Sequence, residues 1–363
     1  MNTEKNAQTT SKRISGFELL RIISMILITL HHITMTYGSE SPNYYIRIWA
    51  QFLYIGGKVG VNCFVLLSSW FLIDKPFDIR RIFRVHRQVF FYSIMIFAVG
   101  FVAIPNTIDF SDILKSFLPV IFNHYWFLTT YIGLLLIAPF LNMFLKSASK
   151  RRLKLLILIG SLLFTLIPTF TAQTPFNDNL SWFAFLYILA AYFKKYDTRV
   201  KKLLGTWYVF PCAWIFIFFT SVVMTIFERV IPQLSEGINF FSGMYILPQL
   251  INSVSLFLLC ERSEIKSDAV NWIGKHTVAS YLIQSNCVLI PIRIMFLNVV
   301  FTSFPVFLYP ILSVLVAFFM LFLGVGCNLI YEWFSKQDMP RKWECFKEKE
   351  MKYLVEKCLE ALR

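Results

Sequence analysis

The chain has 363 residues, of which 57% are hydrophobic, 18% aromatic and 15% charged. Soluble domains usually carry about 25% charged residues, so this composition excludes an ordinary soluble globule and indicates a polytopic membrane protein. The net charge of +14 does not indicate nucleic-acid binding, because most Lys and Arg residues mark one side of the predicted helices. The seven cysteines form no C-x-x-C pair, so neither a disulfide framework nor a metal site is predicted.

Apolar segments recur along the whole chain, and most are long enough to cross a membrane as a helix. The sequence therefore predicts an all-α transmembrane bundle of about ten helices. The predicted helices cover residues 17–37, 52–73, 88–105, 124–145, 153–170, 181–193, 206–227, 242–260, 270–292 and 306–334.

The basic residues alternate in density between the two sides of this predicted bundle. With the N-terminus placed inside, the inner segments carry 28 of the 35 Lys and Arg residues. Cytoplasmic loops show this excess, so we expect both termini in the cytoplasm. The predicted organisation is a cytoplasmic N-terminal tail at 1–15, a transmembrane domain at 16–335, and an amphipathic cytoplasmic tail at 336–363.

The first predicted helix carries Glu18, Arg21, His31 and His32 in an apolar sequence. Ionisable residues are costly in lipid and usually face a cavity or a partner. Eleven residues make about three turns and about 16 Å, so Arg21 and His32 share a face, with Glu18 near it and His31 pointing elsewhere. We expect His32 to act as a general base, because the ordinary pKa of histidine is near neutrality, and Arg21 to hold an anion. The simpler alternative pairs Glu18 with Arg21 and leaves a histidine to hydrogen-bond a neighbouring helix.

The second predicted helix and the inner segment after it supply two further features. Gly56, Gly57 and Gly60 favour close helix packing, and Ser68 either packs or lines a cavity. In the following segment, DIRRIFRVHRQ, two arginines lie three residues apart and share one side of a helical turn. Guanidinium forks suit phosphates, although the charge bias of inner loops would also explain these arginines. The candidate phosphate-binding residues are Arg80, Arg81 and Arg84.

The fourth predicted helix begins with His124, Tyr125 and Trp126 at the predicted outer interface. Aromatic residues gather at such interfaces, which accounts for Trp126. His124 at the mouth of the bundle is a candidate contact for an outer polar substrate.

These features, in their order and spacing, resemble the acyltransferase-3 family of bacterial membrane acyltransferases over residues 14–335. The matching pieces are Arg21 with His32, the segment FVLLSSWFL, Arg81 with Arg84, WFL at 126–128 and YLIQ at 281–284. Two positions depart from the family pattern. Ser69 stands where the family has a glycine, and Gln284 stands where it has a histidine. Glutamine can hydrogen-bond but cannot act as an acid or base at neutral pH, so Gln284 suffices only if the position orients substrate.

The resemblance implies transfer of an acyl group, usually acetyl, from cytoplasmic acyl-CoA to a sugar hydroxyl of a surface glycan. It makes His32 the catalytic base and Arg21 its supporting residue, and it assigns the coenzyme A phosphates to Arg81 and Arg84. From the sequence itself, Glu18 joins the catalytic candidates and Arg80 the candidates for coenzyme A binding. Acetyl-CoA is then a co-substrate, and no permanently bound cofactor or metal is expected. The candidate substrate contacts are His124, Trp126, Ser68 and Gln284.

The expected location is the bacterial cytoplasmic membrane, and the expected partners are membrane lipids, acyl-CoA, a polymeric or lipid-linked glycan, and polysaccharide synthesis or export machinery. Nucleic acid is not expected as a partner. Two other functions fit the same composition: a polysaccharide or lipid-linked sugar transporter without covalent chemistry, and an assembly subunit of an export system. Transporters more often show duplicated halves with interrupted helices, and no internal repeat is visible in the sequence.

Overall fold

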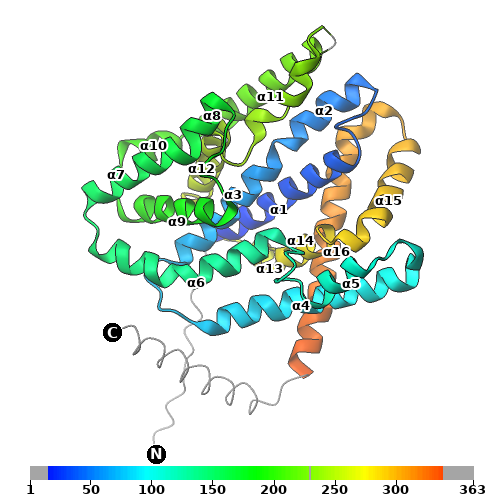
Figure 1. Cartoon of the computed structure of the whole chain (residues 1–363), viewed down its shortest axis with the longest axis horizontal. Helices are drawn as coiled ribbons and strands as arrows, with labels where there is room; N and C mark the ends of the chain where they lie inside the picture. Colours follow the sequence, from blue (N-terminus) through cyan, green and yellow to red (C-terminus); the bar gives the residue numbers. More distant parts are fainter. Residues whose placement is uncertain (1–14, 229, 338–363) are drawn as a thin grey trace, which may run out of the picture.

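The computed structural model describes residues 15–228 and 230–337, and within these ranges every regular element is a helix (Figure 1). This confirms the predicted all-α fold. Eight of the described helices are long and apolar enough to cross a membrane, or nine if a bent pair counts as one span, close to the predicted ten. The predicted terminal tails lie almost wholly outside the described residues.

Helix α1 (Ser15–Thr36) runs through the middle of the bundle and packs against α3 (Gly56–Leu72), α12 (Leu247–Glu261), α14 (Thr277–Gln284) and α16 (Tyr309–Gln337) (Figure 1). The glycines of α3 let these helices approach. A Cβ atom on Gly60 would lie 2.5 Å from the Ser24 carbonyl oxygen, and one on Gly57 would overlap the ring of His31. The close packing predicted for these glycines is therefore confirmed.

The remaining helices surround this core. Helix α2 (Tyr44–Tyr54) leads directly into α3, and together they form one span of 29 residues. Two short helices, α5 (Phe110–Phe117) and α10 (Arg199–Leu204), lie outside the predicted helices. The other elements are α4 (Ile79–Ala103), α5 (Phe110–Phe117), α6 (Trp126–Ser147), α7 (Lys150–Ser161) joined by a π-helical turn to α8 (Ile167–Thr171), α9 (Asn179–Lys195), α10 (Arg199–Leu204), α11 (Val209–Phe227), α13 (Asp268–Lys275) and α15 (Ile290–Thr302).

The single helix predicted at 270–292 is wrong. The structure divides this stretch among α13, α14 and α15, and the halves Asp268–Gln284 and Cys287–Thr302 meet at 67°. The side chain of Asn286 accepts from Val288 N and begins a new turn, and Pro291 sits in the first turn of α15. Proline is accepted there because it needs no N–H partner at a helix start. The bend brings α15 back toward the end of α14.

Several contacts join segments that the charge pattern assigns to the same side of the bundle. Three interactions join predicted inner loops or helix ends: Lys194 Nζ to Trp70 O (2.9 Å), Lys201 Nζ to Glu261 Oε1 (3.1 Å) and Arg262 Nη1 to Gly205 O (3.0 Å). Two join predicted outer segments: Arg47 Nη1 to Glu228 Oε1 (2.6 Å) and Tyr309 OH to Tyr37 O (2.9 Å). These contacts agree with the predicted grouping of the segments, and the two-sided arrangement with its cytoplasmic end stays a prediction from charge.

Candidate active site

An apolar cavity lies along one face of α1. Arg21, Met25, Ile28 and His32 follow one another at steps of four, three and four residues, so they share that face. The cavity is lined by Met25, Ile28, Val61, Phe64, Phe127, Leu128, Val278 and Tyr281. Because Met25 and Ile28 lie between Arg21 and His32, the cavity lies between the two polar residues, which the helix separates by about 16 Å.

His32 stands at one end of this cavity, beside Gln284 of α14. Its Nδ1 atom is buried and has no hydrogen-bond partner among the described residues. Gln284 is only 4% exposed, and its Nε2 donates to Met25 Sδ at 3.3 Å. The Gln284 Oε1 atom is also buried without a partner in the described chain. The structure therefore brings two predicted site residues together and leaves both with unused polar atoms.

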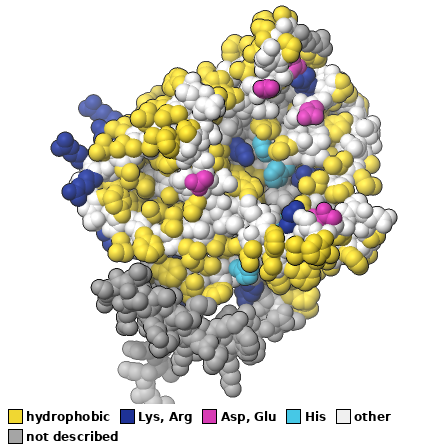
Figure 2. All heavy atoms as spheres, in the orientation of Figure 1, with side chains coloured by type: hydrophobic (Ala, Val, Ile, Leu, Met, Phe, Trp, Pro, Cys, Tyr) yellow, Lys and Arg dark blue, Asp and Glu magenta, His cyan; other side chains and the backbone are white. Residues whose placement is uncertain are grey.

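Two cations complete this end of the site, and the sequence alone did not assign either a role. Lys58 and Arg293 are the basic side chains, besides His31, that act electrostatically on His32. The Lys58 ammonium lies 5.4 Å from the centre of the Trp126 ring, and Arg293 Nη1 donates to the Gln284 carbonyl oxygen at 2.7 Å. Figure 2 shows histidine side chains next to Lys and Arg side chains in a recess near the centre of the view.

His31 faces a different part of the bundle, as the helical geometry predicts. Its Nδ1 atom lies 2.9 Å from the Tyr54 carbonyl oxygen, which can only accept, so that nitrogen carries a proton. The ring lies 4.1 Å from the Tyr54 ring and packs on Gly57. These contacts give His31 a role in joining α1 to the junction of α2 and α3.

Glu18 and Arg21 lie on α1 in the two turns before Met25, which lines the cavity. Arg21 Nη1 donates to both carboxylate oxygens of Glu18 at 2.9 Å, so the simple pairing considered from the sequence is confirmed. Arg21 remains half-buried, with 30% of its side chain exposed. Tyr131 of α6 lies beside Ser68 and within electrostatic range of Arg21 and Arg81. Ser68 therefore belongs to the Arg21 end of the site, with a tyrosine that the sequence did not indicate.

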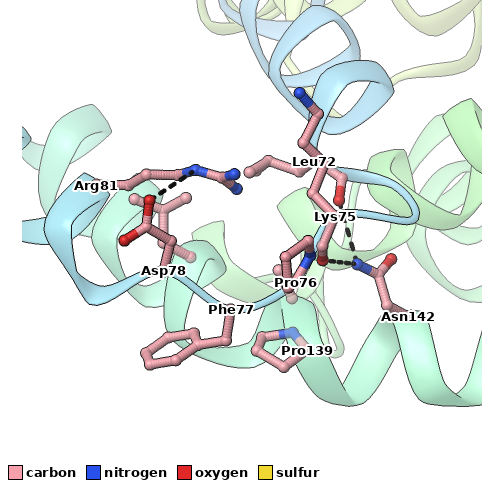
Figure 3. A pocket seen from close by; sticks show the side chains of 10 residues that line it. Leu72, Lys75, Pro76, Phe77, Asp78, Arg81, Pro139 and Asn142 are labelled. Atoms are coloured by element: carbon pink, nitrogen blue, oxygen red, sulfur yellow. Dashed lines mark hydrogen bonds and ion pairs between the residues drawn. The ribbon is translucent and has the colours of Figure 1, made fainter. Parts of the chain in front are cut away.

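A second, inner pocket lies where the loop before α4 meets α6 (Figure 3). Arg81 extends into it and holds Asp78 with a 3.9 Å contact between Nε and Oδ2. Asn142 closes the opposite wall by donating to Leu72 O at 3.1 Å and Lys75 O at 3.2 Å.

The other two arginines of this segment stand outside that pocket. Arg84 is exposed, and Arg80, 66% exposed, pairs with Asp78 at 3.4 Å. The three arginines therefore do not converge on one enclosed site, and Arg81 alone lines it. Phosphate binding by this cluster stays a prediction.

His124 lies in the connection before α6, in a small cluster at the predicted outer end. Its Nε2 atom is 3.7 Å from Cys287 Sγ, which donates to Asp112 Oδ1 at 3.4 Å, and its ring stacks 4.6 Å from Tyr125. Burial lowers the pKa of His124 below the usual histidine value, so the ring is neutral at pH 7. Of the two candidate substrate contacts at the predicted outer end, Trp126 lies 5.4 Å from the Lys58 ammonium, which acts on His32, whereas His124 faces Cys287.

Comparison with known protein families indicates which reaction this site supports. A family model described as an acyltransferase domain, acyltransferase-3, matches residues 14–333. The match includes every site residue named above. Comparisons with curated proteins and with solved structures find no match. The chain therefore belongs to the acyltransferase-3 family and is an acyltransferase.

Proposed function

We propose that this protein transfers an acyl group, acetyl by family default, from cytoplasmic acyl-CoA to a hydroxyl of a bacterial cell-surface or cell-wall glycan. The observation that carries the proposal is the apolar cavity on α1 between a polar end at Arg21 and a polar end at His32. The cavity has a volume of about 30 Å³, so the side chains around it would have to move apart to admit the arm of a donor.

Acyl-CoA suits this cavity because its charge is concentrated at one end. Its phosphates would bind at the inner end near Arg81, with Arg80 and Arg84 adding positive charge outside the pocket. Arg21, whose guanidinium is already oriented by Glu18, would meet the donor where it enters the cavity. The uncharged arm of the donor would follow the apolar lining and present its thioester to His32.

The reaction needs one base and no redox step. His32 takes the proton of the acceptor hydroxyl while that oxygen attacks the thioester carbonyl carbon. The new C–O bond forms, the C–S bond breaks, and the coenzyme A thiolate recovers the proton from His32. Gln284 is placed beside His32 to accept an imidazole N–H and fix the orientation of the ring.

The acceptor would enter from the end opposite the basic loops. The charge asymmetry supports a bacterial cytoplasmic membrane location with inner termini. A polymeric or lipid-linked glycan of a capsule, exopolysaccharide or cell wall would then meet the donor at His32, alongside synthesis or export machinery.

The test is proton NMR of the surface glycan from cells with and without the gene, before and after mild alkali. An alkali-labile acyl signal that is present only with the gene is the expected result. An unchanged acyl pattern with less glycan would contradict the proposal and favour transport or assembly.

A further inference from the structure

Lys58 and Arg293 lie on apolar helices near His32, and no carboxylate of the described residues forms an ion pair with either of them. Three comparable cations have partners: Arg21 with Glu18 (2.9 Å), Arg47 with Glu228 (2.6 Å) and Lys275 with Glu332 (2.7 Å). Lys58 lies 5.4 Å from the centre of the Trp126 ring, and Arg293 donates to the Gln284 carbonyl oxygen. Unpaired charge within a membrane segment is costly. We therefore expect an anion from outside the described residues to bind near these two cations.

Buried polar atoms near Lys58 and Arg293 lack hydrogen-bond partners in the described residues. The Nε atom of Arg293 and the Nδ1 atom of His32 are buried without a hydrogen-bond partner in the described residues. Gln284 is more than nine-tenths buried. Buried polar groups in folded proteins are normally satisfied, so these two atoms beside the cations are consistent with a polar ligand at this end of the site.

The donor does not provide the missing negative charge. The phosphates of acyl-CoA belong at the opposite end of the cavity, about 16 Å along α1 from His32, and its thioester is uncharged. The acceptor is the remaining component at this end.

We infer that the acceptor sugar is anionic, with a carboxylate or phosphate close to the acylated hydroxyl, and that Lys58 and Arg293 bind that group. The inference rests on the proposed function and specifies its substrate class. The Arg293 guanidinium fork suits either anion by paired hydrogen bonds, and the Lys58 ammonium adds charge on the Trp126 side. The two cations would hold the sugar so that its hydroxyl faces His32.

The experiment uses the full-length protein purified into phospholipid nanodiscs, with acetyl-CoA and three matched acceptors. These are methyl glucoside, methyl glucuronide and methyl glucoside 6-phosphate, compared by the kcat/KM for acetylated product measured by mass spectrometry. An anionic acceptor should be preferred over the neutral one by about tenfold or more. Preference for the glucuronide identifies a carboxylate ligand, and preference for the 6-phosphate identifies a phosphate.

Variants assign the preference to the two cations. Lys58→Gln and Arg293→Gln should each lower the preference several-fold, whereas Arg293→Lys, which keeps the charge, should retain most of it. Lys266→Gln is the matched control, because it removes one positive charge from an exposed loop residue and should leave the preference unchanged. Thermal melts of each variant in nanodiscs verify folding.

The outcomes separate the inference from the proposed function. Equal kcat/KM values for neutral and anionic acceptors would overturn the inference, as would a preference that survives both glutamine variants. Equal slowing with all acceptors in those variants would also overturn it and would place the cations in the chemical step. If acetyl-CoA is neither transferred nor hydrolysed, the proposed function itself fails.

Discussion

Glu18 holds Arg21 through both carboxylate oxygens at 2.9 Å, and Gly274 of α13 packs directly against that carboxylate. A Cβ atom on Gly274 would lie 2.6 Å from Glu18 Oε2. The orientation of the arginine at the inner end of the cavity therefore depends on a glycine more than 250 positions away in the chain.

Gly274→Ala should disturb this pair without removing any charge. The added methyl group must displace the buried carboxylate, at a cost of about 1–3 kcal/mol in the free energy of unfolding. We expect a lower thermal midpoint and at least a several-fold loss of acyl transfer, measured with purified protein. Gly326→Ala is the control, because a Cβ atom there has no neighbour within 4 Å. Equal behaviour of the two variants would show that the contact with Glu18 does not matter.

Arg81 and Arg84 should contribute unequally to donor binding. Arg81 lines the inner pocket and Arg84 is exposed outside it, and exposed charges are screened by salt. Arg81→Ala should weaken coenzyme A binding about tenfold, and Arg84→Ala should weaken it less and mainly at low salt. Calorimetric titration of each variant with coenzyme A at two salt concentrations measures the difference. Identical affinities for both variants would make the pocket irrelevant to the donor.

Gln284 should act on the reaction through His32. Gln284→Leu keeps a similar volume but removes the oxygen that lies unpaired beside the imidazole. The expected result is a fall of about tenfold in kcat with little change in the KM for acetyl-CoA. Gln284→His, which restores a polar ring, should remain active. A leucine variant with wild-type kcat would exclude an orienting role.

The side of α1 that carries both Arg21 and His32 could be predicted, because it depends only on helical geometry. Eleven positions return to the same side of a helix, so the separation of His31 from His32 follows from the sequence. The pairing of Glu18 with Arg21 was foreseen for the same local reason, since three positions place the two side chains side by side.

The positions of Gln284, Lys58 and Arg293 around His32 depend on tertiary contacts, so helical geometry alone could not predict them. The long apolar stretch around Tyr281 suggested one helix, although Pro291 was a visible signal for a new helix start. Only the bend at Asn286 brings Arg293 to the end of α14. Lys58 was visible as a cation in an apolar helix, but its position beside His32 requires the packing of α3 on α1.

The spacing of Arg81 and Arg84 put them on one side of α4, but burial separates them. The loop that precedes α4 and the inner end of α6 decide which guanidinium is enclosed. Helical periodicity contains no information on that loop.

The central claim is that His32, and not His31, takes the proton of the acceptor. The most direct measurement is the alkali-labile acyl signal in the proton NMR spectrum of the surface glycan, recorded for a deletion strain that expresses wild type, His32→Ala or His31→Ala at matched membrane levels. Loss of a general base costs about 10²–10⁴ in rate, so His32→Ala should abolish the signal. His31→Ala should keep it at a lower thermal stability, because His31 loses its 2.9 Å bond to Tyr54 O. Full acylation with His32→Ala, or equal loss in both variants, would contradict this account.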